Sequence, residues 1–288
     1  ISNTQGKVMS VIDALFTATS AVCVTGLVTV ETGSFYSIFG QSIVLILIQI
    51  GGLGLMTFTT LMFVVIGRRI SLRDRMLIAE QFNQNQLSGA IKLVISIASL
   101  TGLIEFLGAV LLSIRFIPQF GLMKGIWFSV FHSISAFCNA GFDILGKGEF
   151  QSIIAYVEDP LVTLTIGGLI LFGGLGFTVI KDVWTKRRWK KLTLHSKVVF
   201  ATTAGLLVFG FICFALFEWK NPGTLQPLSL SGKLLASFFQ SITPRTAGYA
   251  TINFGMVEPE TNLITTLLMF IGASPSSTGG GIKTTTIA

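Results

Sequence analysis

Three glycines of this chain recur at the same distance from a preceding phenylalanine. The segments that they close are equal in length, and each leads into a large apolar residue and a long hydrophobic stretch; they cover residues 16–26, 131–141 and 238–248. A helix that enters a membrane, stops halfway and turns back at a glycine can present backbone carbonyls to an ion. The repeat therefore predicts three ion-binding turns made of main chain.

The physical chemistry of such a turn favours a cation. A re-entrant helix points the negative end of its dipole at the membrane centre, and its last carbonyls lack partners within the helix. Glycine readily adopts the backbone conformations that aim successive carbonyls along one axis. We expect the carbonyls that bind the cation at nine residues: Val24, Thr25, Gly26, Asn139, Ala140, Gly141, Thr246, Ala247 and Gly248.

Composition places these turns in a membrane. Of the 288 residues, 51% are hydrophobic and 11% are charged, against roughly 25% charged residues in soluble domains. Four stretches meet or approach the ~20 apolar residues that span a bilayer, at 40–67, 91–117, 160–180 and 198–219, and a fifth begins at Asn262. Shorter runs at 11–23, 125–138 and 233–243 fit re-entrant half-helices. The sequence therefore predicts an all-α, multi-pass integral membrane protein.

Enzyme chemistry finds no support. The sequence contains no phosphate-binding loop, no H-E-x-x-H and no G-x-S-x-G motif. Its two His and three Cys residues leave little material for a metal cage or a disulfide framework. We expect no catalytic residue and no bound cofactor apart from the transported ion.

The positive charge gives the orientation of the helices. Basic runs at 68–75 and 181–197 directly follow apolar spans, so the positive-inside rule makes both loops cytoplasmic and nucleic-acid binding is disfavoured. Each unit then reads outer helix, half-helix, glycine turn, inner helix, around a central pore. The expected divisions are a first repeat without its outer helix (1–67), a basic cytoplasmic loop (68–90), a second repeat with its cytoplasmic loop (91–190) and a third repeat (191–288). A fourth unit is absent, so we expect the chain to be part of a longer protein.

The inner helices carry glycine clusters at 51–54 and 173–176, and a third cluster at 279–281. Small residues let helices pack closely, and we favour this interpretation for the first two clusters. In the third unit some ten residues without bulky apolar side chains interrupt the span. Exposed backbone at membrane depth is tolerated only where protein buries it or where it lines water.

Three segments resemble the Trk/Ktr/HKT superfamily of potassium and sodium transporters, most closely its KtrB-like membrane subunits. They are residues 17–27, Thr243-Pro-Arg-Thr-Ala-Gly-Tyr249 and Ser277-Thr-Gly-Gly-Gly-Ile-Lys283. The resemblance implies four repeats around one pore per subunit, with filter glycines at Gly26, Gly141 and Gly248. It also implies uptake of K⁺, with Na⁺ as a second candidate, by a homodimer in the bacterial plasma membrane.

The resemblance further implies a cytosolic, KtrA-like ring of nucleotide-binding regulatory subunits, so that nucleotide acts only through a partner. We expect this ring to dock on the basic faces at 68–75 and 186–191.

The broken third inner helix would act as a gate below the filter. A Gly/Ser/Thr-rich loop has little packing to hold it, and a lysine at its end would place positive charge near the ion path; the alternative is a lysine that snorkels to the cytoplasm. The expected gate residues are Ser276, Ser277, Thr278, Gly279, Gly280, Gly281 and Lys283.

Two other functions stay open. A Na⁺-coupled or Na⁺-conducting secondary transporter would need an intramembrane coupling carboxylate, for which Glu105 is the candidate; we favour a structural role for this residue. A non-transporting assembly subunit would leave the glycine turns without a purpose. We also expect Arg245 to bond helix carbonyls or an outer acid, and His132 to be a hydrogen-bonded core residue.

Overall fold

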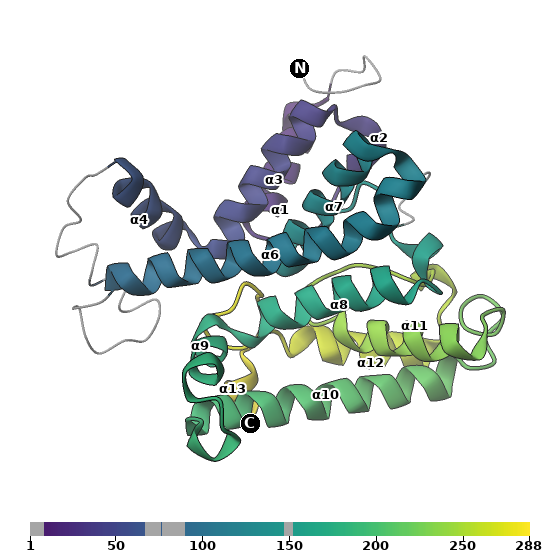
Figure 1. Ribbon diagram of the computed structural model, residues 1–288. Helices are drawn as coiled ribbons and strands as arrows, with labels where there is room; N and C mark the ends of the chain where they lie inside the picture. The colour runs from purple at the N-terminus through teal and green to yellow at the C-terminus, as the bar shows by residue number, and fades with distance from the viewer. Residues whose placement is uncertain (1–8, 67–75, 77–89, 147–151) are drawn as a thin grey trace.

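The computed structural model describes residues 9–66, 76, 90–146 and 152–288, and these residues are almost entirely helical (Figure 1). No described residue belongs to a β-strand; Ile271 and Ile282 form an isolated bridge, and Tyr36 is also a bridge residue. The predicted all-α fold is confirmed. The α-helices are α1 (Val11–Val22), α2 (Thr32–Phe35), α3 (Ile38–Leu53), α4 (Leu55–Ile66), α6 (Ala90–Phe120), α7 (Leu122–Phe137), α8 (Pro160–Leu175), α9 (Phe177–Lys186), α10 (Leu194–Glu218), α11 (Leu230–Ile242), α12 (Pro259–Phe270) and α13 (Thr284–Ile287). Short 3₁₀ turns cover Ile154–Tyr156, Trp189–Lys191 and Phe254–Met256.

Two described helices are long and apolar enough to cross a membrane by themselves. They are Ile91–Phe120 within α6 and Leu194–Glu218, which is α10. Both agree with the predicted spans at 91–117 and 198–219 to within a few residues. In the predicted scheme they are the outer helices of the second and third repeats.

The other two predicted spans are not continuous helices, and here the prediction is wrong. The stretch 40–67 divides into α3 and α4 at Gly54, and the stretch 160–180 divides into α8 and α9 at Gly176, where the two helices meet at 94°. The backbone is nearly the same at both breaks, with φ 82° and ψ 141° at Gly54 and φ 92° and ψ 140° at Gly176. A right-handed helix cannot pass through a positive φ, and glycine adopts it without a steric penalty.

The three predicted half-helices are present as α1, α7 and α11. In the second repeat the chain reverses between α6 and α7 at Gly121, where φ is 82°. A β-carbon on Gly125 would lie 2.6 Å from Cα of Ile117, so glycine permits the closest approach of these two helices. Figure 1 shows α7 folded back on α6, and α11 beside α10 in the same relation.

The interior of the molecule lies where these half-helices meet the inner helices. Phe131, Phe137 and Phe239 are fully buried there, together with Ile48 and Ile166. They belong to one continuous cluster of apolar side chains that joins α3, α7, α8 and α11. The ends of the half-helices are therefore held by packing on several sides.

The inner-helix glycines lie directly against the ends of the half-helices. A β-carbon on Gly51 would overlap the carbonyl oxygen of Val22, and one on Gly52 would lie 2.7 Å from Cβ of Cys138. The close-packing interpretation of the clusters is thus confirmed for these residues. The clusters also supply the helix breaks at Gly54 and Gly176, which the sequence analysis missed.

We predict that Gly173→Ala destabilises the protein, because the added methyl group would overlap the carbonyl oxygen of Phe137 and lie 2.8 Å from Oγ1 of Thr278. Overpacking of this kind costs about 1–3 kcal/mol. Gly168→Ala is the matched control on α8, since no atom of the described residues lies within 4 Å of its β-carbon. Thermal unfolding of the full-length protein in detergent should show a lower Tm only for Gly173→Ala. Equal Tm values would contradict the packing argument.

Candidate functional site

The three predicted turns share an unusual backbone geometry. The residue two positions before each glycine has a positive φ, of 55° at Val24, 57° at Asn139 and 82° at Thr246. The glycines themselves follow with φ values of 73°, 70° and 81° at positions 26, 141 and 248. Non-glycine residues adopt a positive φ only when their surroundings require it. The same turn has therefore been built three times from three different side-chain sets.

The turns meet one another at their glycines. A β-carbon on Gly26 would overlap the carbonyl oxygen of Ala140 and lie 3.4 Å from Cα of Gly141. A β-carbon on Gly141 would in the same way overlap the carbonyl oxygen of Ala247 and lie 3.4 Å from Cα of Gly248. The first turn therefore contacts the second turn, and the second turn contacts the third.

Among the described residues, the carbonyl oxygens of the turns have no hydrogen-bond donor. Each turn uses its N–H groups to close onto its own half-helix, as when Thr25 donates to the Ser20 carbonyl at 2.9 Å and Ala140 to the Ser135 carbonyl at 2.8 Å. Within the described part of the chain, no residue donates to a main-chain oxygen of the nine predicted filter residues. Asn139, Ala140 and Ala247 are buried, where unpaired carbonyls are rare. The oxygens of the turns are therefore free to accept water or a cation.

Side-chain hydroxyls fix the chain just beyond the second and third turns. Ser135 donates to the Phe142 carbonyl at 2.7 Å, and Thr243 donates to the Tyr249 carbonyl at 2.6 Å. The Tyr249 hydroxyl then donates to the same Phe142 carbonyl at 2.8 Å and so links the third turn to the second. These bonds orient the next carbonyls without occupying those of the turns.

The loop that interrupts the third inner helix lies against the second turn. The Thr278 hydroxyl donates to the Phe137 carbonyl at 3.0 Å and accepts a bond from the Asn139 side-chain amide at 2.9 Å. The Thr278 N–H donates to the Gly173 carbonyl at 3.2 Å. One residue of the loop is therefore bonded both to the second turn and to α8.

The break at Gly176 explains how the loop is held. In an unbroken helix the Gly173 carbonyl would accept from the N–H of Phe177; here Phe177 donates to the Ser276 carbonyl at 2.8 Å. The neighbouring carbonyl of Gly174 accepts from the N–H of Ser274 at 3.0 Å. The loop thus caps the carbonyl groups that the bend in α8 leaves open.

The expectation of a loosely packed loop is wrong for Thr278 and Gly279, which are buried, whereas Gly280 and Gly281 are exposed. Ser274 is 0% and Thr278 is 8% exposed, and the loop is closed internally by a bond from the Ala273 N–H to the Gly280 carbonyl at 3.0 Å. Lys283 does not reach for the cytoplasm, because its ammonium group donates to the Gly279 carbonyl at 2.8 Å. The polar side chains of the loop form hydrogen bonds with one another and with the backbone. The polar composition of the segment does not reveal that these bonds hold the loop in place.

A cavity of about 200 Å³ lies beside this loop. Gly51, Gly52, Leu53 and Gly54 form one side, at the break in the first inner helix, and Phe177 lies at the break in the second. The loop supplies the remaining wall: Ser276, Ser277 and Thr278. The three interrupted inner helices therefore enclose a common space.

Glu105 is 9% exposed and has partners in two other elements. Its Oε2 accepts from the Gln49 side-chain amide on α3 at 3.2 Å, and its Oε1 lies 3.9 Å from the Cys138 sulfur. Its main-chain carbonyl accepts from the Ser133 hydroxyl at 2.6 Å. These contacts agree with the favoured structural role, which is to connect the back of the second turn to the first inner helix.

The fully buried His132 is a satisfied core residue, as predicted. Its Nδ1 lies 2.7 Å from the Phe128 carbonyl, and its Nε2 accepts from the Ile144 N–H at 3.3 Å. Because a carbonyl can only accept, Nδ1 carries the proton and the ring is neutral. His132 therefore supports the segment that follows the second turn and does not belong to the ion-binding group.

The prediction for Arg245 is wrong. Arg245 is 7% exposed, and its Nε forms no hydrogen bond with any described residue. It borders a cavity of about 10 Å³ together with Thr203, whose hydroxyl likewise has no partner in the described structure. A space of this size holds about one water molecule, which could bond to both side chains.

Two acids lie beyond the turns, where the sequence suggested only outer loops. Oε1 of Glu31 and Oδ1 of Asp143 lie 3.1 and 3.4 Å from the position of a β-carbon on Gly146. Burial, together with the nearby charge of Glu31, raises the pKa of Asp143 to about 6. Negative charge is thus concentrated two residues from Gly141. The pair is recognised only from the short distance between the two side chains, and the sequence gives no information about that distance.

Residues 1–288 match the TrkH family, which is described as cation transport protein. The chain belongs to this family. The match includes all three glycine turns and the interrupted third inner helix. The TrkH fold therefore accounts for both the repeated half-helices and their convergence.

The relatives confirm this placement. The chain is 46% identical over 280 residues to the Ktr system potassium uptake protein B of Bacillus subtilis, covering 97% of this chain and 62% of that protein. It is also 46% identical over 283 residues to the potassium/sodium uptake protein NtpJ of Enterococcus hirae, covering 98% of this chain and 62% of the relative. The chain thus spans a little under two thirds of the length of these proteins.

A solved structure confirms the fold. The potassium transporter TrkH of Vibrio parahaemolyticus superposes with a TM-score of 0.67 at 19% sequence identity. The superposition covers 97% of this chain and 53% of the TrkH chain. The similarity establishes an all-α membrane transporter fold, and the homologues are transporters, not enzymes.

We predict that Thr278→Val loosens the loop, because it removes the acceptor of the buried Asn139 amide and the donor to the Phe137 carbonyl. Leaving buried polar groups unpaired costs about 1–3 kcal/mol, and about 1.4 kcal/mol corresponds to a tenfold change in opening. Hydrogen exchange of residues 272–283 should therefore be about tenfold faster in Thr278→Val than in the wild type. Thr278→Ser keeps the hydroxyl and serves as the control. Equal exchange in the two variants would show that the hydroxyl does not hold the loop.

Proposed function

We propose that the protein takes up monovalent cations through a channel-like pore, with K⁺ as the main ion. The observation that carries this proposal is the set of unclaimed main-chain oxygens on three turns that meet at their glycines. Such oxygens can replace the hydration shell of an alkali cation. The relatives support the ion assignment, since one is named a potassium uptake protein and another a potassium/sodium uptake protein.

The arrangement also suits a filter of moderate selectivity. The half-helices α1, α7 and α11 direct the negative ends of their dipoles towards the turns. Each turn offers a short run of oxygens, at Val24, Thr25 and Gly26 in the first repeat and at the equivalent residues in the others. Fewer coordinating oxygens than in a long potassium-channel filter should reduce the discrimination between K⁺ and Na⁺. Conduction of Na⁺ therefore remains the second candidate for the same pore.

The loop at 276–283 is the proposed gate. It borders the cavity below the turns and is bonded to the second turn through Thr278 and Asn139. The ammonium group of Lys283 is held on the loop by the Gly279 carbonyl. A displacement of the loop would move this positive charge and would widen the cavity. The predicted gate residues therefore act as one hydrogen-bonded unit.

The partner assignments follow from the relatives. The Ktr relatives are named as proteins of a system, which supports a further component that works with this chain. We propose that this component is a KtrA-like cytosolic ring and that the chain forms a homodimer in the bacterial plasma membrane. Exposed basic residues at 187–191 offer one docking face for that ring. The second predicted face, at 68–75, lies outside the described residues. Nucleotide would then regulate the pore only through the ring.

A coupled transporter is the weaker alternative. Its candidate coupling group, Glu105, is bonded to Gln49 and lies behind the second turn, next to Cys138. The three repeats have the same order of outer helix, half-helix and inner helix and the same predicted orientation in the membrane. This disfavours a secondary transporter built from inverted repeats. A purely structural subunit would leave the three matching turns without a physical reason.

We predict that Gly141→Ser reduces cation uptake at least about tenfold. A serine at φ 70° is strained by about 1–3 kcal/mol, and its β-carbon would overlap the Ala247 carbonyl oxygen. The assay is rescue of a potassium-uptake-deficient bacterium by the full-length protein, with Rb⁺ uptake measured at several K⁺ and Na⁺ concentrations. Gly102→Ser on α6 is the control, because no described atom lies within 4 Å of its β-carbon. Normal uptake by Gly141→Ser at normal membrane expression would refute the proposed function.

We predict that deletion of residues 276–281 raises Rb⁺ flux, because it removes the wall of the cavity that the loop supplies. The control is Ser276→Ala, which keeps the main-chain bond from Phe177 to the carbonyl of residue 276. Flux should rise several-fold in the deletion variant and stay at the wild-type level in the control. Unchanged flux in a deletion variant that reaches the membrane would exclude the loop as a gate.

A further inference from the structure

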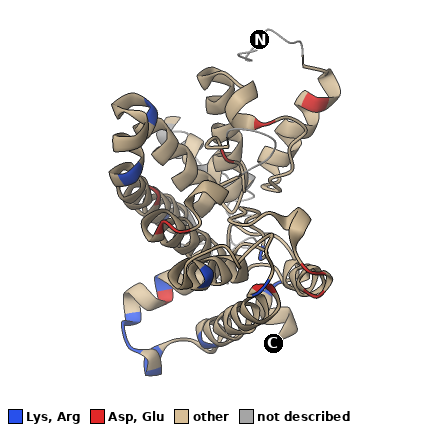
Figure 2. Ribbon diagram, turned by 90° about the vertical axis from the view of Figure 1, so that its right-hand side faces the viewer, with Lys and Arg blue, Asp and Glu red and all other residues tan. Residues whose placement is uncertain are grey.

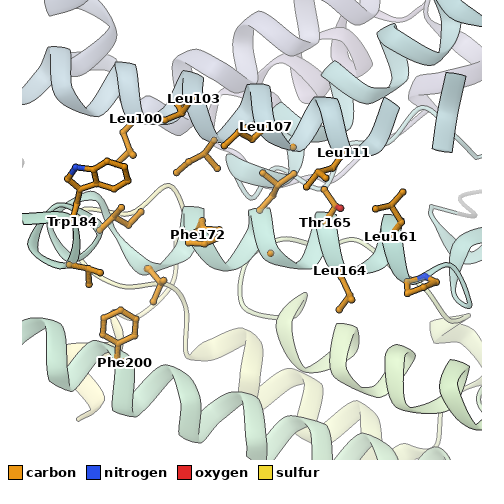
Figure 3. Close-up of a pocket in the computed structure, with 18 residues that line it drawn as sticks. Leu100, Leu103, Leu107, Leu111, Leu161, Leu164, Thr165, Phe172, Trp184 and Phe200 are labelled. Carbon is orange, nitrogen blue, oxygen red and sulfur yellow. The ribbon is translucent and has the colours of Figure 1, made fainter. Parts of the chain in front are cut away.

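An apolar groove separates the outer and inner helices of the second repeat. It has a volume of about 930 Å³ and lies between α6 and the bent pair α8 and α9, with Phe200 of α10 at one edge. Figure 3 shows Leu103 and Leu107 on one wall and Phe172 on the other. Gly168 leaves the middle of the groove open, since no described atom lies within 4 Å of its β-carbon.

The groove follows the direction in which the helices cross the membrane. It reaches from Pro160, the first residue of α8, to Trp184 near the end of α9. The 16 residues of α8 alone are about 24 Å long, most of the ~30 Å hydrocarbon thickness of a bilayer. The groove therefore has the length and the apolar lining that an extended acyl chain requires.

The two ends of the groove differ in charge. At the Pro160 end, Nε of Arg115 lies 2.6 Å from Oδ2 of Asp159. The opposite charges of this ion pair cancel. The Trp184 end adjoins a cluster of exposed basic residues on α9 and the following loop, which Figure 2 shows in blue. The members of this basic cluster are Lys181, Arg187, Arg188, Lys190 and Lys191.

The basic end has the features of a lipid headgroup level. Trp184 and Trp189 are 66% and 58% exposed there, and tryptophan is enriched at membrane interfaces. The positive-inside rule places this end at the cytoplasmic leaflet, where anionic headgroups attract clustered Lys and Arg residues. The positive charge of the cluster favours lipids with an anionic headgroup. The apolar lining of the groove contacts only acyl chains and cannot distinguish one headgroup from another.

We propose that this groove binds an anionic phospholipid of the cytoplasmic leaflet, with an acyl chain beside Gly168 and Phe172 and the headgroup at Lys181 of the basic cluster, which leaves the basic residues at 187–191 for the regulatory ring. A second copy of the chain fits less well. A two-fold axis normal to the membrane would bring identical patches to the same depth, so two basic clusters would face each other.

The bound lipid would touch both arms of the bend in the second inner helix. Leu175 lines the groove before the break, and Ile180 and Val183 line it after the break. Directly after the break, the N–H of Phe177 is bonded to the Ser276 carbonyl of the loop. A lipid that fixes the angle between α8 and α9 would therefore also fix one attachment point of the loop. This step rests on the proposed gate, whereas lipid binding itself does not.

The test is lipid retention by the purified full-length protein, measured by native mass spectrometry after incubation with equal amounts of phosphatidylglycerol and phosphatidylcholine. The wild type should retain phosphatidylglycerol at least five-fold more than phosphatidylcholine. Gly168→Phe fills the groove and should lose this retention. Gly102→Phe makes the same change at an open position of α6 outside the groove and should behave as wild type. Lys181→Glu should keep binding of lipid but lose the preference for the anionic headgroup.

Three results would overturn the proposal. They are equal retention of both lipids by the wild type, unchanged retention in Gly168→Phe, and loss of a dimer in Gly168→Phe, which would make a second copy the occupant. Each variant is first checked for a wild-type Tm and a single size-exclusion peak. If Gly168→Phe fails this check, Phe172→Trp narrows the groove from its exposed rim and replaces it. No ion flux enters the measurement, so its outcome is independent of the proposed transport function.

Discussion

The arrangement of the three turns depends on one constraint: main-chain oxygens that accept no hydrogen bond from any described residue must be positioned by close packing of the backbone. The turns that end at Gly26, Gly141 and Gly248 meet this constraint through close backbone packing. Gly51 and Gly52 let the first inner helix approach Val22 and Cys138 with no side chain between them. Apolar packing alone could not give this precision, because side chains of any size would separate the turns from the inner helices.

The same glycine clusters interrupt the helices to which they belong. Gly54 and Gly176 have nearly identical backbone angles, so the first two inner helices break in the same way at equivalent positions. In the third repeat the break is extended to the loop between α12 and α13. That loop then bonds to the carbonyls of Gly173 and Gly174, which the break in α8 has left open. The interruption in one repeat thus completes the hydrogen bonding of another.

Much of this could be predicted from the sequence, because the half-helices and turns repeat with fixed spacing and contrast with long apolar spans. The breaks at Gly54 and Gly176 could not, since hydrophobicity continues through Leu55 and Phe177 on their far sides. The packing of Thr278 was also hidden, because it bonds to Asn139, which lies 139 residues earlier. Local composition carries no information about such a distant partner. The environment of Arg245, whose Nε has no hydrogen-bond partner among the described residues, has the same origin: most of the residues around it come from α8 and α10 rather than from its own segment.

The asymmetry of the second turn has a consequence for how a pore of this kind would work. Asn139 occupies the positive-φ position that Val24 and Thr246 occupy in the other turns, and its amide is bonded to the loop through Thr278. A loop that moved away would release this amide while the main chain of the turn stayed in place. The freed side chain could then donate to the oxygens of its own turn and compete with a cation for them. Opening of the gate and the affinity of the filter would in that case be coupled through one side chain, and the two could not be tuned independently.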